Sequence, residues 1–213
     1  MSAGDRLEVS WGALTPGRAR EYLRTFGAPS EGSKRLLVEV LARVAGGREL
    51  SVVDLGCGNG QLLEAFRASG AQWLYTGVDF SEPLLAAARE AFADDARASF
   101  VHADVNTLEG LDGHWDVALY SHVVEMIGSP ERSILRAAKL ADAIAIRFFE
   151  PPEFDADLVE LREMEVGDGR MVPYLRRKMG RDYYRMILAK AGCQEVDLYR
   201  DESSKDQVHL LRF

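Results

Sequence analysis

The sequence has few cysteines and no long apolar run. Cys57 and Cys193 are its only cysteines, too few for a disulfide framework. No stretch approaches the ~20 consecutive apolar residues of a membrane-spanning helix. The first six residues also lack the charged-then-apolar order of a signal peptide. We therefore expect a soluble, cytoplasmic protein with no membrane partner.

Positive charge is also scarce. The chain has 26 lysines and arginines against 34 aspartates and glutamates, which gives a net charge of −8. A uniformly basic surface for nucleic acid is therefore absent, and a nucleic-acid partner is disfavoured. The chain does have 213 residues, of which 47% are hydrophobic. That is enough for one domain with a sizeable core, and we expect no metal site in it.

A short apolar run that ends in a glycine-rich loop organises the chain. Residues 52–55 are typical of a buried parallel strand. Gly56, Gly58 and Gly60 follow at alternate positions, and a helix is predicted directly after them. A ligand at such a loop meets free backbone N–H groups and the positive end of a helix. A dinucleotide fingerprint would need glycine or alanine where this chain has Gln61, which disfavours a nicotinamide oxidoreductase.

Acidic residues occur at the ends of three predicted strands. Asp54 precedes the glycine loop, Asp79 ends the strand 73–78, and Asp104 follows the strand 99–102. In a doubly wound sheet these ends meet at the crevice where ligands bind. We expect Asp79 to accept the hydroxyl hydrogens of a ribose and Asp104 to accept an adenine amine. For each acid the alternative is a role in its own turn.

The remaining pattern predicts an α/β fold. Helices are expected from Thr15–Pro16 to near Gly27, over 33–44, after Ser81, after Ser129–Pro130 and over 181–191, and further strands over 115–120, 143–149, 194–199 and 207–213. The linker 201–206 is too short for a crossover helix, so the last two strands should form an antiparallel hairpin. The prediction is a doubly wound, mostly parallel seven-stranded sheet that ends in this hairpin.

Two regions lie outside this regular alternation. Residues 1–48 are expected to form a helical cap, from which Trp11, Arg18, Tyr22 and Lys34 could reach over a ligand. Residues 153–180 hold seven acids and five bases, and they break the alternation of strands and helices. Their length indicates an insertion over the ligand crevice, and the alternative is a solvated surface excursion.

Four stretches together carry a resemblance to a known family. They are DLGCGNG at 54–60, VDFS at 78–81, ADV at 103–105 and WDVALYSHVVEMI at 115–127. Over residues 49–213 the chain resembles the class I S-adenosylmethionine-dependent methyltransferases, which have a Rossmann-like fold. The last stretch is similar to the ubiquinone/menaquinone-biosynthesis-like group, whose members often act on small molecules. The resemblance implies S-adenosyl-L-methionine as cofactor and S-adenosyl-L-homocysteine as product.

The resemblance also implies a role for each matching position. Asp54, Gly56, Cys57, Gly58 and Gly60 would form the pocket for the methionine and ribose portions, with Cys57 as a small filler, not a nucleophile. Asp79 would hold the ribose diol, with Phe80 beside the adenine, and Asp104 and Val105 would fix the adenine edge. Ser121 and His122 would lie near the methionine portion and the sulfonium.

His122 is the candidate catalytic base, because an imidazole titrates near neutral pH. Its alternative role is that of a buried histidine in the cofactor shell, and Glu125 and Tyr183 are weaker candidates for the base. The predicted activity is methyl transfer to O, N or C of a small molecule. RNA or protein methylation, aminopropyl transfer and cofactor binding without catalysis remain alternatives, and the oligomeric state is left open.

Overall fold

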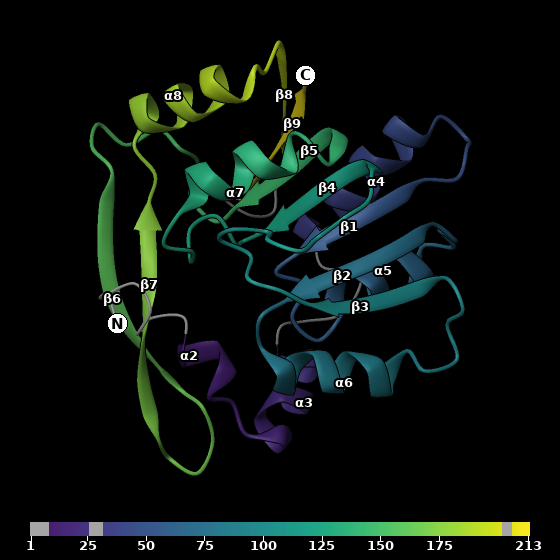
Figure 1. The fold of residues 1–213 in the computed structure, drawn as a ribbon, viewed down its shortest axis with the longest axis vertical. Helices are drawn as coiled ribbons and strands as arrows, with labels where there is room; N and C mark the ends of the chain where they lie inside the picture. The colour runs from purple at the N-terminus through teal and green to yellow at the C-terminus, as the bar shows by residue number, and fades with distance from the viewer. Residues whose placement is uncertain (1–8, 26–31, 202–205) are drawn as a thin grey trace.

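The computed structural model describes residues 9–25, 32–201 and 206–213 (Figure 1). The predicted end of the first helix near Gly27 lies outside these ranges. The helices are α2 (Val9–Gly12), α3 (Pro16–Thr25), α4 (Gly32–Ala45), α5 (Gln61–Ala68), α6 (Glu82–Ala91), α7 (Pro130–Ala137) and α8 (Arg181–Ala191). The strands are β1 (Ser51–Leu55), β2 (Leu74–Asp79), β3 (Ala98–His102), β4 (Trp115–Ser121), β5 (Ala141–Phe148), β6 (Leu158–Glu165), β7 (Met171–Lys178), β8 (Glu195–Arg200) and β9 (Gln207–Arg212).

Seven of these strands form the main sheet, in the order β3-β2-β1-β4-β5-β9-β8. The strands β1 to β5 run parallel, so their carboxyl ends lie at one edge. β9 is antiparallel to both β5 and β8, with Ile146 of β5 opposite His209. The predicted fold class is confirmed, including the C-terminal hairpin.

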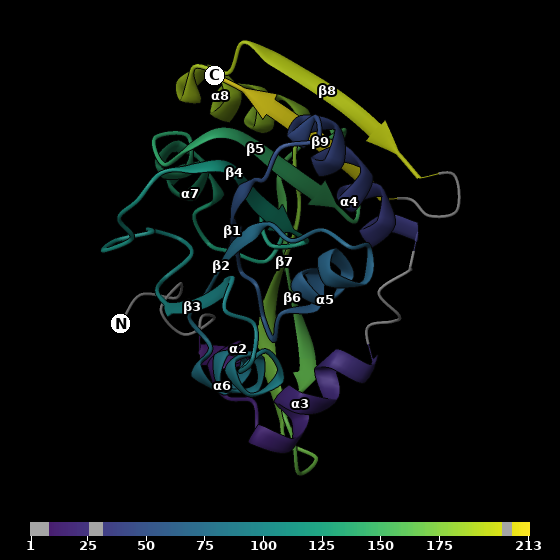
Figure 2. The same cartoon turned by 90° about the vertical axis from the view of Figure 1, so that its right-hand side faces the viewer.

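Helices cover both faces of the sheet, as the unbroken apolar runs of its inner strands require. Successive residues point to opposite faces, so Val52 belongs to one core cluster and Val53 to the other. The first cluster packs against α4 and α5, and the second against α7 and α8. Figure 2 shows α4 and α5 on one side of the sheet and α7 on the other.

The charged insertion contains a two-stranded antiparallel ribbon that the sequence analysis did not predict. β6 pairs with β7 over eight residues in a continuous register, from Leu158 opposite Lys178 to Glu165 opposite Met171. The ribbon stands beside the main sheet, at the left of Figure 1. The turn that joins its strands is attached to the N-terminal helices, because the Thr15 N–H donates to the carbonyl of Val166 at 2.8 Å.

The N-terminal region has two structural parts. α4 packs within the main core, where Leu37 and Leu41 are fully buried. α2 and α3 instead contact α6 and the ribbon strand β7. Only α2 and α3 therefore occupy the place expected of a cap.

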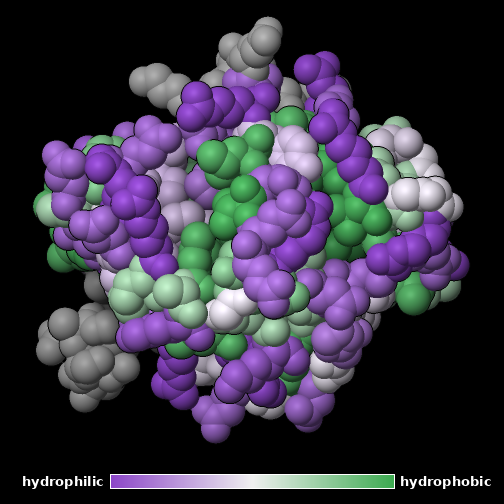
Figure 3. All heavy atoms as spheres, turned by 90° about the horizontal axis from the view of Figure 1, so that it is seen from above, coloured by the Kyte–Doolittle hydropathy of each residue, from purple (hydrophilic) through white to green (hydrophobic). Residues whose placement is uncertain are grey.

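The opposite end of the molecule is formed by α8 and β8. Seen from above, it carries apolar surface between charged side chains (Figure 3). Within the part of the chain that the structure describes, no helix is both long and apolar enough to cross a bilayer.

Candidate functional site

A cavity of about 200 Å³ lies where β1, β2, β3, β4 and β5 end. It is lined by Trp11, Gly56, Gly58, Asp79, Phe80, Leu84, Val105, Asn106, Ser121, His122, Val123, Met126, Ile127 and Phe149. Seven of the residues predicted for a cofactor site line it: Gly56, Gly58, Asp79, Phe80, Val105, Ser121 and His122. Parallel topology brings these positions together from four separate segments, as the sequence analysis expected.

The glycine loop needs glycine for both conformation and space. Gly56 has φ +84°, and a Cβ added there would lie 2.5 Å from Val123 Cγ2. Gly60 has φ +85°, and a Cβ there would lie 2.6 Å from Phe92 Cε2. Side chains at these two positions would therefore collide with their neighbours as well as strain the backbone. Gly60 does not line the cavity but serves as the N-cap of α5.

Asp79 joins the glycine loop to the end of β2. Its Oδ2 accepts the Gly58 N–H at 2.8 Å, and its Oδ1 accepts the Ser81 N–H at 2.9 Å. Burial raises the pKa of this carboxyl, while the backbone N–H groups of Ser81 and Gly58 oppose the rise. A carboxylate has about four lone-pair positions, so Asp79 keeps acceptor capacity for a ligand hydroxyl.

Asp54 and Cys57 lie behind the cavity wall and do not line it. Asp54 is 1% exposed, and the Tyr75 hydroxyl donates to its Oδ2 at 2.7 Å. Its Oδ1 is buried and has no hydrogen-bond partner among the described residues. Burial raises the pKa of Asp54 to about 7, and the charge of Asp79 adds to this rise. The hydrogen bond from Tyr75 opposes it.

The Cys57 thiol is also buried. Burial raises its pKa well above the usual value, which makes it a poor nucleophile. A Cβ on Gly77 would come 2.8 Å from Cys57 Sγ, so the thiol fills space between loop and sheet. This agrees with the predicted role as a filler.

After β3, the cavity is lined by Val105 and Asn106 and not by Asp104. Asp104 Oδ1 accepts hydrogen bonds from both the backbone N–H and the side-chain amide of Asn106, at 2.8 and 3.0 Å. Asp104 thus orders the turn that presents its neighbours. The side-chain Oδ1 of Asn106 accepts the Ser129 N–H at 2.9 Å, which ties this turn to the start of α7.

His122 is held by a polar network at the end of β4. Its Nε2 lies 2.9 Å from Asp206 Oδ2, and the same oxygen accepts a hydrogen bond from Arg147 Nε at 3.1 Å. Arg147 also donates to the Ser121 hydroxyl at 3.2 Å. The His122 ring stacks on Phe149, with 3.3 Å between centroids. Asp206 and Phe149 therefore hold the imidazole directly, and Arg147 holds Asp206 in place.

The protonation of His122 follows from this network. Burial lowers its pKa to about 4, and the Asp206 hydrogen bond opposes that shift only in part. The imidazole is neutral at pH 7. Because the Asp206 carboxylate only accepts, the single ring proton sits on Nε2 and leaves Nδ1 as an acceptor.

Of the two other candidate bases, only Glu125 lies near the site. Its carboxylate accepts the N–H groups of Phe149 and Glu150 at 3.0 and 3.2 Å, and Arg176 Nη2 lies 3.6 Å away. Burial raises its pKa to about 7 despite that cation. We take burial as dominant, because the residue is 1% exposed and the ion pair is long.

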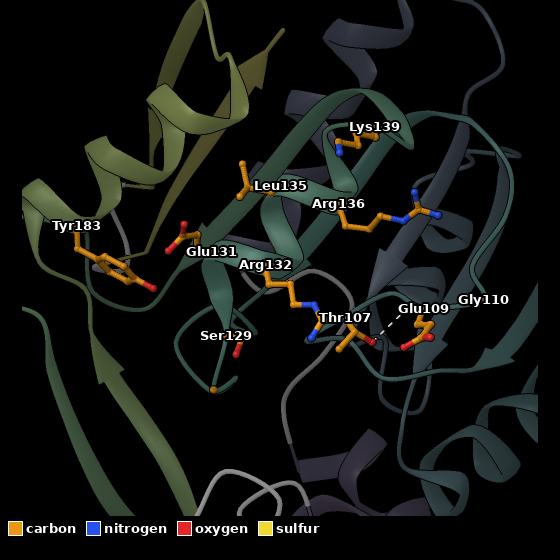
Figure 4. A pocket seen from close by; sticks show the side chains of 11 residues that line it. Thr107, Glu109, Gly110, Ser129, Glu131, Arg132, Leu135, Arg136, Lys139 and Tyr183 are labelled. Atoms are coloured by element: carbon orange, nitrogen blue, oxygen red, sulfur yellow. Dashed lines mark hydrogen bonds between the residues drawn. The ribbon is translucent and has the colours of Figure 1, made fainter. Parts of the chain in front are cut away.

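Tyr183 lines a different cavity, of about 650 Å³, on the outer side of α7. Arg132, Arg136 and Lys139 lie along it, with Tyr183 across from Glu131 (Figure 4). The segment 126–129 contributes to both cavities, since Met126 and Ile127 line the inner one and Gly128 and Ser129 the outer one. Apart from Tyr183, the outer cavity contains no predicted site residue.

Of the four residues expected to reach over a ligand, Trp11 lines the cavity. Its ring packs edge-on against Tyr174 of the ribbon, with 6.0 Å between centroids. Arg18 instead pairs with Glu165 of β6 at 3.3 Å, and Lys34 is buried. The Tyr22 side chain lies outside the described residues.

Sequence reasoning missed several contributors. Asn106 and Phe149 line the cavity, and Arg147 and Asp206 hold His122. Arg147, which follows the apolar run 143–146 of β5, was an available signal, because a buried charge needs a partner. Asp206 gave no such signal, since it lies 84 residues from His122.

Comparisons with known proteins agree with this geometry. A family model described as a methyltransferase domain matches residues 52–141. The demethylmenaquinone methyltransferase of Clavibacter sepedonicus is 33% identical over 138 residues, 62% of this chain and 54% of that protein. The chain therefore matches about half the length of that relative.

Two solved structures show the same fold. The CcbJ methyltransferase of Streptomyces caelestis has a TM-score of 0.70 at 16% identity, covering 96% of this chain and 98% of that one. The 1,6-didemethyltoxoflavin-N1-methyltransferase of Burkholderia thailandensis has a TM-score of 0.60 at 20% identity, covering 86% and 79%. That structure contains bound 1,6-didemethyltoxoflavin and S-adenosylhomocysteine.

These matches support the resemblance stated from the sequence at the level of a methyltransferase domain, and the solved structures confirm the fold. Residues 52–141, with the sheet that they help to build, are similar to the methyltransferase domain that this family model describes.

Proposed function

We propose that the protein transfers a methyl group from S-adenosylmethionine to an oxygen, nitrogen or carbon atom of a small molecule. The observation that carries this proposal is the junction of the glycine loop with Asp79. There a buried carboxylate is anchored by two backbone N–H groups and lines a cavity at the carboxyl ends of parallel strands. This is the position at which such sheets bind ligands.

The residues present fit this cofactor. Asp79 retains lone pairs for a ribose diol, and Phe80 and Val105 supply apolar surface for an adenine. A Cβ at Gly56 would close the loop against Val123, so the glycine keeps the loop open to its ligand. When bound, S-adenosylmethionine supplies a methyl group on a cationic sulfonium, which suits a cavity with buried acids behind it.

The rest of the cavity lining bears on the kind of methyl acceptor. Trp11, Val123, Met126, Ile127 and Phe149 are apolar, and the cavity is small. Such a pocket suits a small, partly apolar molecule. The matched relative acts in menaquinone methylation by its name, and the toxoflavin enzyme methylates a small heterocycle. Both support a small-molecule acceptor for this chain.

We assign His122 the role of orienting the acceptor. Its Nδ1 can accept a hydrogen bond from a hydroxyl or amine. The hydrogen bond to Asp206 keeps the ring proton on Nε2. With a pKa of about 4 it is a weak base. It therefore contributes through alignment of the nucleophile, which can supply much of the rate enhancement of a displacement at carbon.

The test uses the purified chain, methyl-labelled S-adenosylmethionine and a fractionated small-molecule extract. Label in a low-mass product, lost in Asp79→Ala, supports the proposal. Label that enters RNA or protein instead would favour those acceptors. An aminopropylated product formed when decarboxylated S-adenosylmethionine replaces the labelled cofactor would point to aminopropyl transfer. If calorimetry shows no saturable binding of S-adenosylhomocysteine, the proposed function is wrong.

A further inference from the structure

The outer strand of the ribbon has an open edge. Among the described residues β6 pairs only with β7, over an unbroken register of eight residues. Figure 1 shows β6 on the outermost side of the molecule, with β7 between it and α2. The strand contains no proline and no bulge, two devices that usually protect such an edge.

The ribbon also exposes apolar side chains between its charged ones. Of the large hydrophobic residues that are exposed in the described chain, half lie on this ribbon: Leu158 at 49%, Val159 at 51%, Leu161 at 65% and Met171 at 51%. Three of them are on β6 itself. An open strand edge with exposed apolar side chains is a template for pairing with another strand.

We propose that β6 pairs antiparallel with β6 of a second copy of this chain, across a two-fold axis at Leu161. A two-fold contact must be self-complementary, and the sequence of β6 meets this requirement. In this register Leu161 faces its own counterpart, Glu160 faces Arg162, and Leu158 faces Met164. Each unlike pair occurs twice: Glu160 with Arg162 matches opposite charges, Leu158 with Met164 matches apolar side chains, and Val159 lies opposite Glu163.

Other two-fold registers are less favourable. A shift of one residue in one direction sets Glu160 against Glu163. A shift of one residue in the other direction places Glu160 against Leu161 and Val159 against Arg162. A shift of two residues places either Glu160 or Arg162 against its own counterpart. Like charges directly opposite each other destabilise a pair of strands. The charge pattern of β6 therefore specifies one register.

The proposed interface would also bear on the site. The ribbon reaches the cavity wall through β7, where the Arg176 guanidinium lies over the Phe149 ring at 4.3 Å and Tyr174 packs on Trp11. Pairing of two ribbons would hold these contacts in place from outside. The proposal does not depend on the methyltransferase activity, because the contact surface lies outside the cavity.

The test measures molecular mass by sedimentation equilibrium on the full chain and on two charge reversals. Glu160→Arg sets one arginine against each copy of Arg162, and Arg162→Glu sets one glutamate against each copy of Glu160. Each should raise the dimer dissociation constant about tenfold or more. An equimolar mixture of the two variants should restore the dimer, because each chain then meets the opposite charge.

Circular dichroism and binding of S-adenosylhomocysteine verify that both variants fold. Arg185→Glu on α8, where the side chain is 71% exposed, is the matched control and should leave the dimer intact. A monomeric wild-type chain would overturn the proposal. So would a dimer that survives both reversals, or a mixture that remains monomeric.

Discussion

Asp79 offers the sharpest test of the cofactor site, because its structural role and its proposed ligand-binding role can be separated. Its oxygens accept the N–H groups of Gly58 and Ser81, and their remaining lone pairs are available to a ribose diol. A hydrogen bond to a charged group contributes about 1.5–3 kcal/mol. Asp79→Asn keeps one acceptor oxygen, so we expect a loss of about 2–4 kcal/mol in S-adenosylhomocysteine binding, or roughly 30- to 700-fold in affinity.

A double-mutant cycle removes the contribution of loop distortion. Calorimetry compares S-adenosylhomocysteine with its 2′-deoxy analogue on the wild-type chain and on Asp79→Asn. In the wild type, loss of the hydroxyl should weaken binding by about 1.5–3 kcal/mol. In Asp79→Asn, loss of the ribose hydroxyl should weaken binding much less, because the carboxylate that accepts its hydrogen bond has already been replaced. If the two changes add within about 0.5 kcal/mol, Asp79 does not touch the ribose and the reasoning is refuted.

Four further predictions concern particular residues. Gly56→Ala should destabilise the fold and weaken cofactor binding more than Gly70→Ala, which has the same left-handed φ but open space around it; urea unfolding and calorimetry measure both. Asp206→Asn should lower the pKa of His122 further below about 4, as followed by NMR titration, because the Asp206 hydrogen bond raises it; a higher pKa would contradict the network. His122→Ala should reduce turnover far more than cofactor affinity, and equal losses in both would remove His122 from acceptor orientation. Glu125→Gln removes a carboxyl whose pKa is raised from 4.5 to about 7. The free energy of unfolding of the wild type, relative to this variant, should fall by roughly 3 kcal/mol as pH rises from 4.5 to 7. The reason is that the folded chain keeps a proton that the unfolded chain releases over this range.

The sheet was predictable because its signal is local. Val52 and Val53 are both buried, one on each face, so the strand appears in the sequence as a continuous apolar run. The glycine loop and Asp79 were predictable for a related reason. In parallel topology the end of each strand identifies the edge at which ligands bind.

The ribbon was not predictable in the same way. One face of β7 carries Tyr174 and Arg176 and the other carries Leu175 and Arg177, so neither face is uniformly apolar. Arg176 and Arg177 are nonetheless buried, through pairing with Glu125 and Asp157. A strand whose inward residues are charged lacks the period-two hydrophobic pattern on which strand prediction depends.

The chemistry of the site was hidden from the sequence for a different reason. An imidazole expected to titrate near pH 7 has a pKa of about 4, because folding buries His122 beside Phe149 and near Arg147. The partner that orients it, Asp206, comes from the linker before the last strand. Spacing along the chain cannot reveal either effect, since both arise only when β4, β5 and β9 become neighbours.

The same tertiary contacts explain why the acceptor pocket is the least predictable part of the molecule. Phe149 follows β5, is held by the Glu125 carboxylate through its N–H, and lies under Arg176 of the ribbon. Trp11 reaches the cavity from the other side and packs on Tyr174. This wall is thus built from α2, β7 and the end of β5, which are far apart in sequence. A change in the ribbon should therefore alter acceptor selectivity while leaving cofactor affinity, set by the glycine loop and Asp79, unchanged.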